Sequence, residues 1–301
     1  MPLDRTIRSM IMWRRVSGVE PELEVAAARE QYRASAIRDR VLDPVAAVAD
    51  LDADGVPVRV YTPQTDRGLV VTYFHGGGFI VGDLDTHDPL CRTVAATLGA
   101  VVVSVQYRRA PENPYPAPIL DAVTAAAWTA RSYGERPHVL AGDSAGACLV
   151  LNVAMAARDA GAPAFAAQLL LYPPVDPTLA SESMWRLGKG YLLTARELAW
   201  FYDLYVPDEA DRSDPKVALL HADLSGLAPT VVGTAEFDPL LDEGLELVAR
   251  LAAAGVEVHH VAGDGLIHGY ALITDLVPAA AHTCAQLLHT LQSVLGSGVS
   301  H

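Results

Sequence analysis

Short apolar runs alternate with longer amphipathic segments along most of this chain, and this alternation restricts its fold more than any other feature. Strands are predicted at 69–74, 101–107, 138–141, 166–172, 230–235 and 256–261, and helices at 88–98, 118–133, 147–160, 242–254 and 279–295. Strands that are apolar throughout are typical of a parallel sheet with helices on both faces. The sequence therefore predicts an α/β fold with a mostly parallel sheet.

The first 68 residues do not follow this rhythm. Residues 1–45 are charged, rich in alanine and compatible with helix, and they contain no strand signal. Asp54-Gly55 then predicts a hairpin between extended runs at 45–50 and 56–61. The aspartates at 50, 52 and 54 imitate the start of an EF-hand calcium loop, but its twelfth position holds Tyr61 instead of glutamate, so no calcium site is expected.

Composition limits the classes of partner and the compartment. A formal net charge of −14 argues against nucleic acid and against adsorption to an anionic membrane. The cysteines Cys91, Cys148 and Cys284 are far apart, each in a predicted helix, and are expected to be buried thiols. The first residues lack the apolar core of a signal peptide, and no run is long enough for a membrane span. A cytoplasmic protein without stable membrane insertion is the expectation.

The segment between Pro174 and Pro229 has no strand signal but contains helical stretches at 183–187 and 194–205. Six aromatic residues gather in it: Trp185, Tyr191, Trp200, Phe201, Tyr202 and Tyr205. Ligands bind beyond the carboxyl ends of strands in open α/β sheets, and the segment begins at such an end. This position favours a lid over a site, and ordinary packing of helices on the sheet is the alternative.

The strongest local motif is Gly142-Asp143-Ser144-Ala145-Gly146, which lies between a predicted strand and a predicted helix. The pattern G-x-S-x-G raises a serine on a sharp corner between strand and helix. Glycine at positions 142 and 146 leaves room for neighbouring backbone. Ser144 is thus a candidate nucleophile, which then needs a base, a group that orients the base, and donors for an oxyanion.

The donors are predicted in His75-Gly76-Gly77-Gly78-Phe79, which follows the strand at 69–74. Consecutive glycines allow backbone N–H groups to point at a ligand oxygen. The motif matches the oxyanion loop described for lipases and esterases, which acts with the N–H after the nucleophile. The predicted donors are Gly76, Gly77 and Ala145, and His75 is expected to be structural.

His268 is the predicted base among the ten histidines of the chain, because it lies in a glycine-flanked loop expected after the last strand. His259 and His260 lie within that strand, so that one of them should face the core. Asp238 is the predicted orienting acid in the loop after the strand at 230–235, with Glu236 as its competitor. The order Ser144, Asp238, His268 is that of α/β-hydrolases.

At this point the chain resembles a known family, the hormone-sensitive-lipase-like esterases, or bacterial lipolytic family IV. Five motifs are similar to those of the family's GDSAG subgroup and occur in the same order. They are His75-Gly76-Gly77-Gly78-Phe79 with 82–88, then 107–112, Gly142-Asp143-Ser144-Ala145-Gly146, 237–240 and 267–269. The resemblance implies an α/β-hydrolase fold with a mostly parallel eight-stranded sheet. It also implies a cap made of N-terminal helices (1–45) and an insertion (175–215) on a catalytic domain formed by 46–174 and 216–301.

The resemblance further implies hydrolysis of short- to medium-chain acyl esters by water, with no metal or cofactor, and a homodimer joined by edge strands. Substrate contacts are expected from Trp13, Phe79, Asp143, Trp185, Tyr191, Trp200 and Tyr205. Two alternatives remain open. The same triad could serve amide or lactone hydrolysis or acyl transfer. A small-molecule receptor such as the plant gibberellin receptors also resembles these esterases, but those receptors lack the histidine that is present here at position 268.

Overall fold

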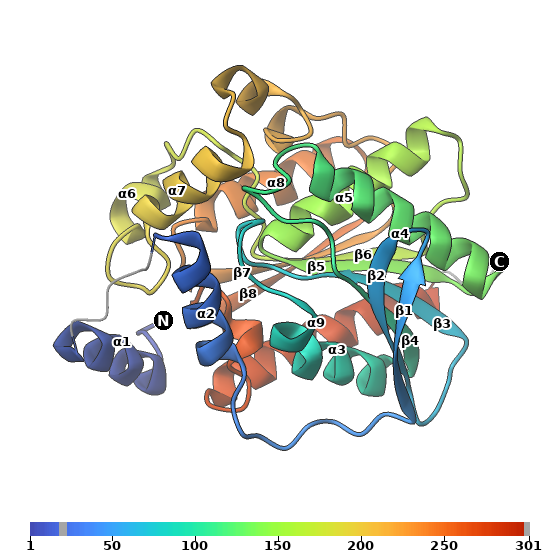
Figure 1. The fold of residues 1–301 in the computed structure, drawn as a ribbon, viewed down its shortest axis with the longest axis horizontal. Coiled ribbons are helices and arrows are strands. Elements are labelled where there is room, and N and C mark those ends of the chain that lie inside the picture. The colour runs from blue at the N-terminus through green and yellow to red at the C-terminus, as the bar shows by residue number, and fades with distance from the viewer. Residues whose placement is uncertain (18–22, 298–301) are drawn as a thin grey trace.

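In the computed structural model, which describes residues 1–17 and 23–297, eight strands form one sheet (Figure 1). The strands are β1 (Ala47–Ala53), β2 (Val56–Thr62), β3 (Leu69–Phe74), β4 (Ala100–Val105), β5 (His138–Asp143), β6 (Ala167–Leu171), β7 (Thr230–Phe237) and β8 (Val258–Ile267). Their spatial order is β1-β2-β4-β3-β5-β6-β7-β8. β1 and β2 pair antiparallel, as does β2 with β4, and every other neighbouring pair is parallel. The predicted α/β-hydrolase fold with a mostly parallel eight-stranded sheet is confirmed.

Helices cover both faces of the sheet, because alternate residues of the buried strands point to opposite sides. On β4, Val101 and Val103 belong to one apolar core, whereas Val102 belongs to the other. The first core is closed by α4 (Ala117–Tyr133), α5 (Ala145–Asp159) and α8 (Leu241–Ala253), and the second by α3 (Leu84–Leu98) and α9 (Pro278–Ser297). The three cysteines are buried in these helices as free thiols, which confirms the sequence prediction.

The remaining helices gather at the side of the sheet where the parallel strands end, on the left in Figure 1. They are α1 (Arg5–Ser17) and α2 (Val25–Ala36) before the sheet, and α6 (Glu182–Leu187) and α7 (Ala195–Tyr205) between β6 and β7. The short 3₁₀ helices η1 (Glu209–Ser213), η2 (Leu219–His221) and η3 (Tyr270–Leu272) complete the set. The predicted hairpin around Asp54-Gly55 is present between β1 and β2. Among the described helices, none combines the length and the apolar character that crossing a bilayer requires.

Several element boundaries differ from the sequence prediction, and three of them bear on the site or on the edge of the sheet. Helix α3 begins at Leu84 instead of residue 88, because the side chains of Asp83 and Thr86 form a capping box there. β5 continues to Asp143, where it still pairs with Leu171 of β6, so the corner at Ser144 follows the strand directly.

The third difference concerns β8. It was expected to end at residue 261, but it runs to Ile267, which pairs with Phe237 of β7 after a register shift. Neither His259 nor His260 is buried, so the prediction that one of them faces the core was wrong. The physical reason is that β8 is the edge strand of the sheet, and its first half is partly open to solvent.

Candidate active site

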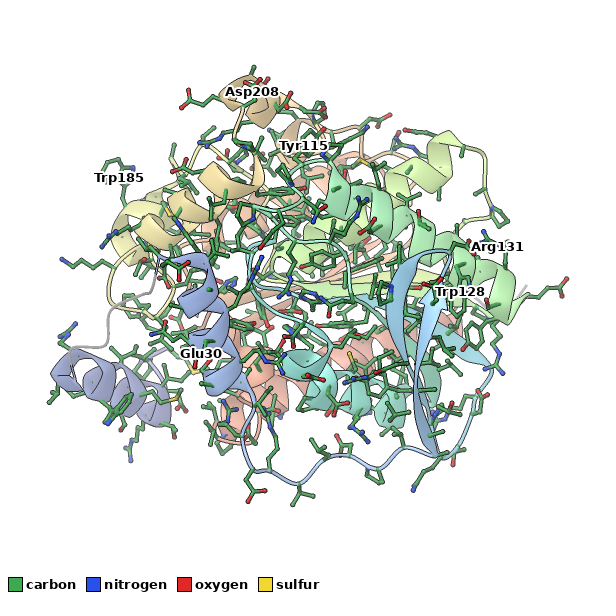
Figure 2. All side chains as sticks on the ribbon, in the orientation of Figure 1. Glu30, Tyr115, Trp128, Arg131, Trp185 and Asp208 are labelled. Carbon is green, nitrogen blue, oxygen red and sulfur yellow. The ribbon has the colours of Figure 1, made fainter. Side chains whose placement is uncertain are left out.

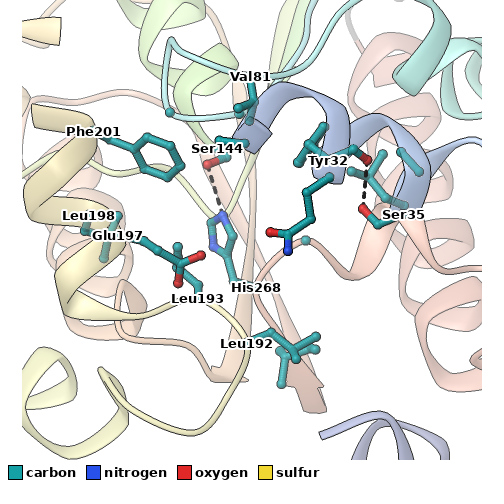
Figure 3. Close-up of a pocket in the computed structure, with 18 of the residues that line it drawn as sticks. Tyr32, Ser35, Val81, Ser144, Leu192, Leu193, Glu197, Leu198, Phe201 and His268 are labelled. Carbon is teal, nitrogen blue, oxygen red and sulfur yellow. Dashed lines mark hydrogen bonds between the residues drawn. The ribbon is translucent and has the colours of Figure 1, made fainter. Parts of the chain in front are cut away.

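Ser144 lies on the sharp corner between β5 and α5. Its backbone has φ 51° and ψ −125°, a region that L-residues rarely adopt and that costs about 1–3 kcal/mol. The surrounding fold holds this conformation, since the Ser144 N–H donates to the Leu171 carbonyl at 2.8 Å. The strain turns the hydroxyl out of the sheet and into a cavity at the end of the strands (Figure 3).

The two glycines of the motif are required by close backbone contacts. A Cβ on Gly142 would lie 2.5 Å from the Gly146 carbonyl carbon, and one on Gly146 would lie 1.9 Å from the carbonyl oxygen of Phe74. Backbone atoms at these distances cannot move aside cheaply. The space that the sequence pattern predicted at positions 142 and 146 is therefore used to pack α5 tightly against the end of β3.

A chain of hydrogen bonds joins Ser144, His268 and Asp238, which come from three distant parts of the sequence. His268 Nε2 lies 3.0 Å from Ser144 Oγ (Figure 3). On the other side of the ring, His268 Nδ1 lies 2.8 Å from Asp238 Oδ2. Asp238 is 1% exposed, and its other oxygen accepts the Leu240 N–H at 2.9 Å. The Tyr172 ring packs edge-on against the imidazole, with 4.7 Å between centroids. The geometry brings together the three residues that the sequence analysis had selected.

The competing residues have other partners. Glu236 accepts the Gly265 N–H at 2.7 Å and does not bond to His268. His75 is fully buried, stacks on Tyr107 at 4.3 Å, and burial lowers its pKa to about 3. The imidazole of His75 is therefore neutral and packed within the loop that follows β3, and it forms no hydrogen bond with Ser144.

The loop after β3 offers different backbone donors from those predicted. The Gly76 N–H donates to Asp143 Oδ1 at 3.0 Å, and Gly76 does not line the cavity. By contrast, Gly77 and Gly78 line the cavity beside Ser144, and no described residue accepts a hydrogen bond from the N–H of either one. The Ala145 N–H is in the first turn of α5, where helical geometry leaves it without an internal acceptor. The prediction of Gly76 as a donor is therefore corrected in favour of Gly78.

Asp143 connects the serine corner to this loop. Besides the Gly76 N–H, its Oδ1 accepts the Tyr73 hydroxyl at 2.7 Å and lies 3.4 Å from His87 Nε2. Burial pushes the pKa of Asp143 upward, but His87 and the Tyr73 hydroxyl outweigh it and hold the pKa below its usual value. The position of the glycine loop relative to Ser144 thus depends on one buried carboxylate.

The cavity above Ser144 and His268 has a volume of about 870 Å³. Its walls are mainly apolar and come from α1, α2, the glycine loop, α7 and the segment after His268; they include Met10, Val81, Leu192, Leu193, Leu198 and Ile273. Glu197 and Phe201 extend from α7 toward Ser144 and His268 (Figure 3). Within residues 1–17 and 23–297, no group of three histidine, cysteine or acidic side chains is arranged to hold a metal ion.

The residues predicted to contact substrate divide into two groups. Trp13, Phe79, Asp143, Trp200 and Tyr205 line the cavity. Trp185 does not: it is 84% exposed on the outer side of α6. Tyr191 is also outside the cavity lining and stacks on Phe237 with 5.4 Å between ring centroids.

Helix α2 is fixed to the loops that surround the site by arginine–carboxylate pairs. Arg29 donates to Glu112 at 2.7 Å and to the carbonyl oxygens of Ile80 and Ala110 at 2.9 Å. Arg33 bonds to Asp83 and to Asp85, the latter at 2.8 Å. The motifs at 82–88 and 107–112 therefore dock this helix over the glycine loop.

Sequence reasoning missed Glu243, which is 3% exposed in the first turn of α8. Burial raises its pKa well above the usual value, although its Oε1 accepts the N–H groups of Val175 and Asp176 at 2.7 and 3.2 Å. Glu243 thus ties the segment after β6 to the helix that follows Asp238. A glutamate at a helix start is common, so its burial had no sequence signal.

Comparisons with known proteins identify the family of this chain. A family model described as alpha/beta hydrolase fold matches residues 71–272. The chain is 36% identical to carboxylic ester hydrolase LipN of Mycobacterium tuberculosis, over 97% of this chain and 83% of that protein. It is 35% identical to ethyl acetate hydrolase of Pseudomonas putida, over 91% of each.

The fold also matches a solved structure along its whole length. The hyperthermophilic esterase from Pyrobaculum calidifontis superposes with a TM-score of 0.90 at 34% identity and covers 100% of both chains. The matched fold, the family model and the two relatives lead to one assignment. The chain belongs to the α/β-hydrolase-fold family of hydrolytic enzymes.

Proposed function

We propose that this protein is a carboxylesterase of the hormone-sensitive-lipase-like GDSAG subgroup that hydrolyses short- to medium-chain acyl esters. Ser144 is its nucleophile, His268 its general base and Asp238 the group that orients His268. The observation that carries the proposal is the chain of hydrogen bonds from Ser144 Oγ through His268 to the buried Asp238. The names of the two relatives, a carboxylic ester hydrolase and an ethyl acetate hydrolase, support an ester as the substrate.

In the first half of the reaction, His268 Nε2 takes the proton of Ser144 as Oγ attacks the ester carbonyl carbon. The C–O bond to the alcohol then breaks, His268 returns the proton to the leaving alkoxide, and an acyl-Ser144 ester remains. In the second half, His268 removes a proton from water, and the hydroxide attacks the acyl carbonyl carbon. The bond from that carbon to Ser144 Oγ then breaks, His268 returns the proton to Oγ, and the carboxylic acid leaves. Asp238 holds the imidazole tautomer that accepts at Nε2 and stabilises the imidazolium ion.

The tetrahedral oxyanion is stabilised by backbone N–H groups. We assign this role to Gly77, Gly78 and Ala145, because the Gly76 N–H is already bonded to Asp143. Removing one such donor typically costs about 2.7–4 kcal/mol of barrier. The donors need no reorganisation at the moment of reaction, since their loop is fixed by Asp143 and by the helix α2 above it.

The cavity suits an apolar ester of moderate size. Its volume of about 870 Å³ is near the upper end of the range for small-molecule sites, and its walls are largely aliphatic and aromatic. We propose that residues 1–45 and 175–215 form the cap that supplies these walls. Residues 46–174 and 216–301 form the catalytic domain beneath them.

The test is hydrolysis of p-nitrophenyl esters from acetate to decanoate by the wild type, Ser144→Ala and Ser35→Ala. Ser35 lines the same cavity but only donates to the Tyr32 carbonyl, so its variant is a matched control. The proposal predicts activity in the wild type and in Ser35→Ala, highest for the shorter chains, and none above background in Ser144→Ala. Equal activity in Ser144→Ala would overturn it.

A further inference from the structure

The outer face of α1 differs in charge from the rest of the molecule. The helix carries four arginines and no acidic residue, although the whole chain has a formal net charge of −14. Arg5, Arg8 and Arg15 are exposed to solvent. Positions 5 and 8 are one helical turn apart, and Met12 and Arg15 continue the same exposed strip.

These three arginines have no carboxylate partner within residues 1–17 and 23–297. Neither an ion pair nor a side-chain hydrogen bond joins Arg5, Arg8 or Arg15 to any residue in the described part of the chain. Elsewhere arginines are usually paired, as Arg131 is with Asp54 and Arg136 with Asp66. The charges of Arg5, Arg8 and Arg15 are therefore unpaired among the described residues and can meet a partner outside the chain.

Apolar side chains are exposed among these charges. Met12 is 54% exposed, Trp13 67% and Val16 80%. The opposite side of the helix is anchored, since Ile7 is fully buried in one of the two apolar cores. Figure 2 shows the same edge of the molecule, on the left, where the exposed Trp185 of α6 also projects.

We propose that this face of α1, formed by Arg5, Arg8, Met12, Trp13, Arg15 and Val16, docks the protein onto the surface of an anionic phospholipid bilayer. A helix with arginines on its polar face and tryptophan beside them lies in the interface between headgroups and acyl chains. Each arginine near an anionic surface contributes about a fivefold gain in affinity. Arginine guanidinium groups bind lipid phosphates bidentately, and the three apolar side chains reach the acyl boundary.

Charge complementarity decides for lipid against the other occupants. A second copy of this chain, with its net charge of −14, would also attract the arginines. The surface that it presents to α1 would, however, have to cover the exposed apolar side chains of this helix as well. A bilayer supplies both anionic headgroups and an apolar boundary in one plane. The net charge of −14, which taken alone argues against adsorption to an anionic membrane, belongs to the whole surface, whereas α1 is locally basic. The acidic remainder is repelled only weakly, because charges are screened beyond about 8 Å at physiological ionic strength.

The docking face adjoins the mouth of the cavity. Ser9 and Met10 of α1 line that cavity, and Trp13 both lines it and is 67% exposed, whereas Met12 and Val16 lie outside the lining. A bilayer held against α1 would therefore place the opening next to dissolved apolar molecules. If the proposed esterase function holds, esters would reach Ser144 from the lipid phase; the docking itself does not depend on that function.

The experiment is sedimentation of the full chain with vesicles of phosphatidylcholine alone or of phosphatidylcholine mixed with phosphatidylglycerol. Binding is expected to the mixed vesicles only and to weaken as salt rises. Replacing Arg5, Arg8 and Arg15 together by glutamine should lower the affinity about 100-fold, at about fivefold for each arginine. Met12→Ser with Val16→Ser should also weaken binding.

The control variant replaces Arg131, Arg136 and Arg158 by glutamine and lowers the net charge by the same amount. Arg131 lies at the opposite edge of the molecule in Figure 2. This variant should bind vesicles like the wild type, and both triple variants should keep the wild-type circular dichroism and turnover of p-nitrophenyl acetate. The proposal is overturned if the wild type does not bind, if both triple variants lose binding equally, or if Met12→Ser instead abolishes a self-association seen without vesicles.

Discussion

Asp143 should control both the stability of the fold and the position of the oxyanion donors. In Asp143→Ala, the Tyr73 hydroxyl and the Gly76 N–H lose their acceptor while they remain buried. Each unsatisfied buried donor costs about 1–3 kcal/mol, so the free energy of unfolding should fall by about 2–6 kcal/mol. The glycine loop is then free to shift. Since one oxyanion donor is worth about 10²–10³ in kcat, kcat should fall by about 100-fold or more.

Asp143→Asn is the matched variant, because an amide oxygen at the Oδ1 position can still accept from both donors. It loses only the negative charge, which His87 and the Tyr73 hydroxyl now stabilise. We expect its free energy of unfolding to fall by less than about 3 kcal/mol and its kcat to exceed that of Asp143→Ala. Urea unfolding and p-nitrophenyl butyrate kinetics measure the two quantities. An Asp143→Ala protein that folds and keeps the wild-type kcat would refute this role.

Three further predictions follow from buried contacts. Burial raises the pKa of Glu243 in the folded protein, so the folded protein keeps a proton that the unfolded chain releases above about pH 4.3. The free energy of unfolding therefore falls as the pH rises, by up to about 1.4 kcal/mol for each pH unit. The advantage of Glu243→Gln over the wild type in urea unfolding should therefore grow from pH 5 to pH 8, and a constant difference would contradict it. Gly146→Ala should cost about 3 kcal/mol or more in thermal unfolding, since its Cβ meets the Phe74 carbonyl oxygen, whereas Gly296→Ala, with open space around it, should not destabilise. Phe201→Ala should raise the decanoate-to-acetate rate ratio by enlarging the cavity beside Ser144, and an unchanged ratio would place the acyl chain elsewhere.

Much of the fold could be predicted because local pattern and tertiary structure agree in it. Each apolar strand from β3 to β7 is followed by a helix, and this alternation alone implies a parallel sheet. β8 is the exception. Gly263 and Gly265 interrupt its pattern, so the sequence suggested a loop, but pairing with β7 after a register shift continues the strand to Ile267. Tertiary pairing overrode local propensity there.

The site was predictable where it depends on chain order, and less so where it depends on side-chain packing. Ser144, Asp238 and His268 each follow a strand directly, and parallel strands bring such positions to one edge of the sheet. The choice among the three glycines depends on Asp143, whose contact with Gly76 joins residues 67 apart. Likewise, the orientation of α6, which leaves Trp185 84% exposed, depends on tertiary packing and has no signal in composition.

We propose that the reaction passes through a covalent acyl intermediate on Ser144. The most direct measurement is peptide mass spectrometry after treatment with diethyl p-nitrophenyl phosphate, which phosphorylates an activated serine hydroxyl and releases p-nitrophenol. We expect one diethylphosphoryl group on Ser144, loss of ester hydrolysis in proportion to labelling, and no label in Ser144→Ala or in His268→Ala. Stoichiometric label on any other residue, or full inactivation with Ser144 unmodified, would show that Ser144 is not the nucleophile.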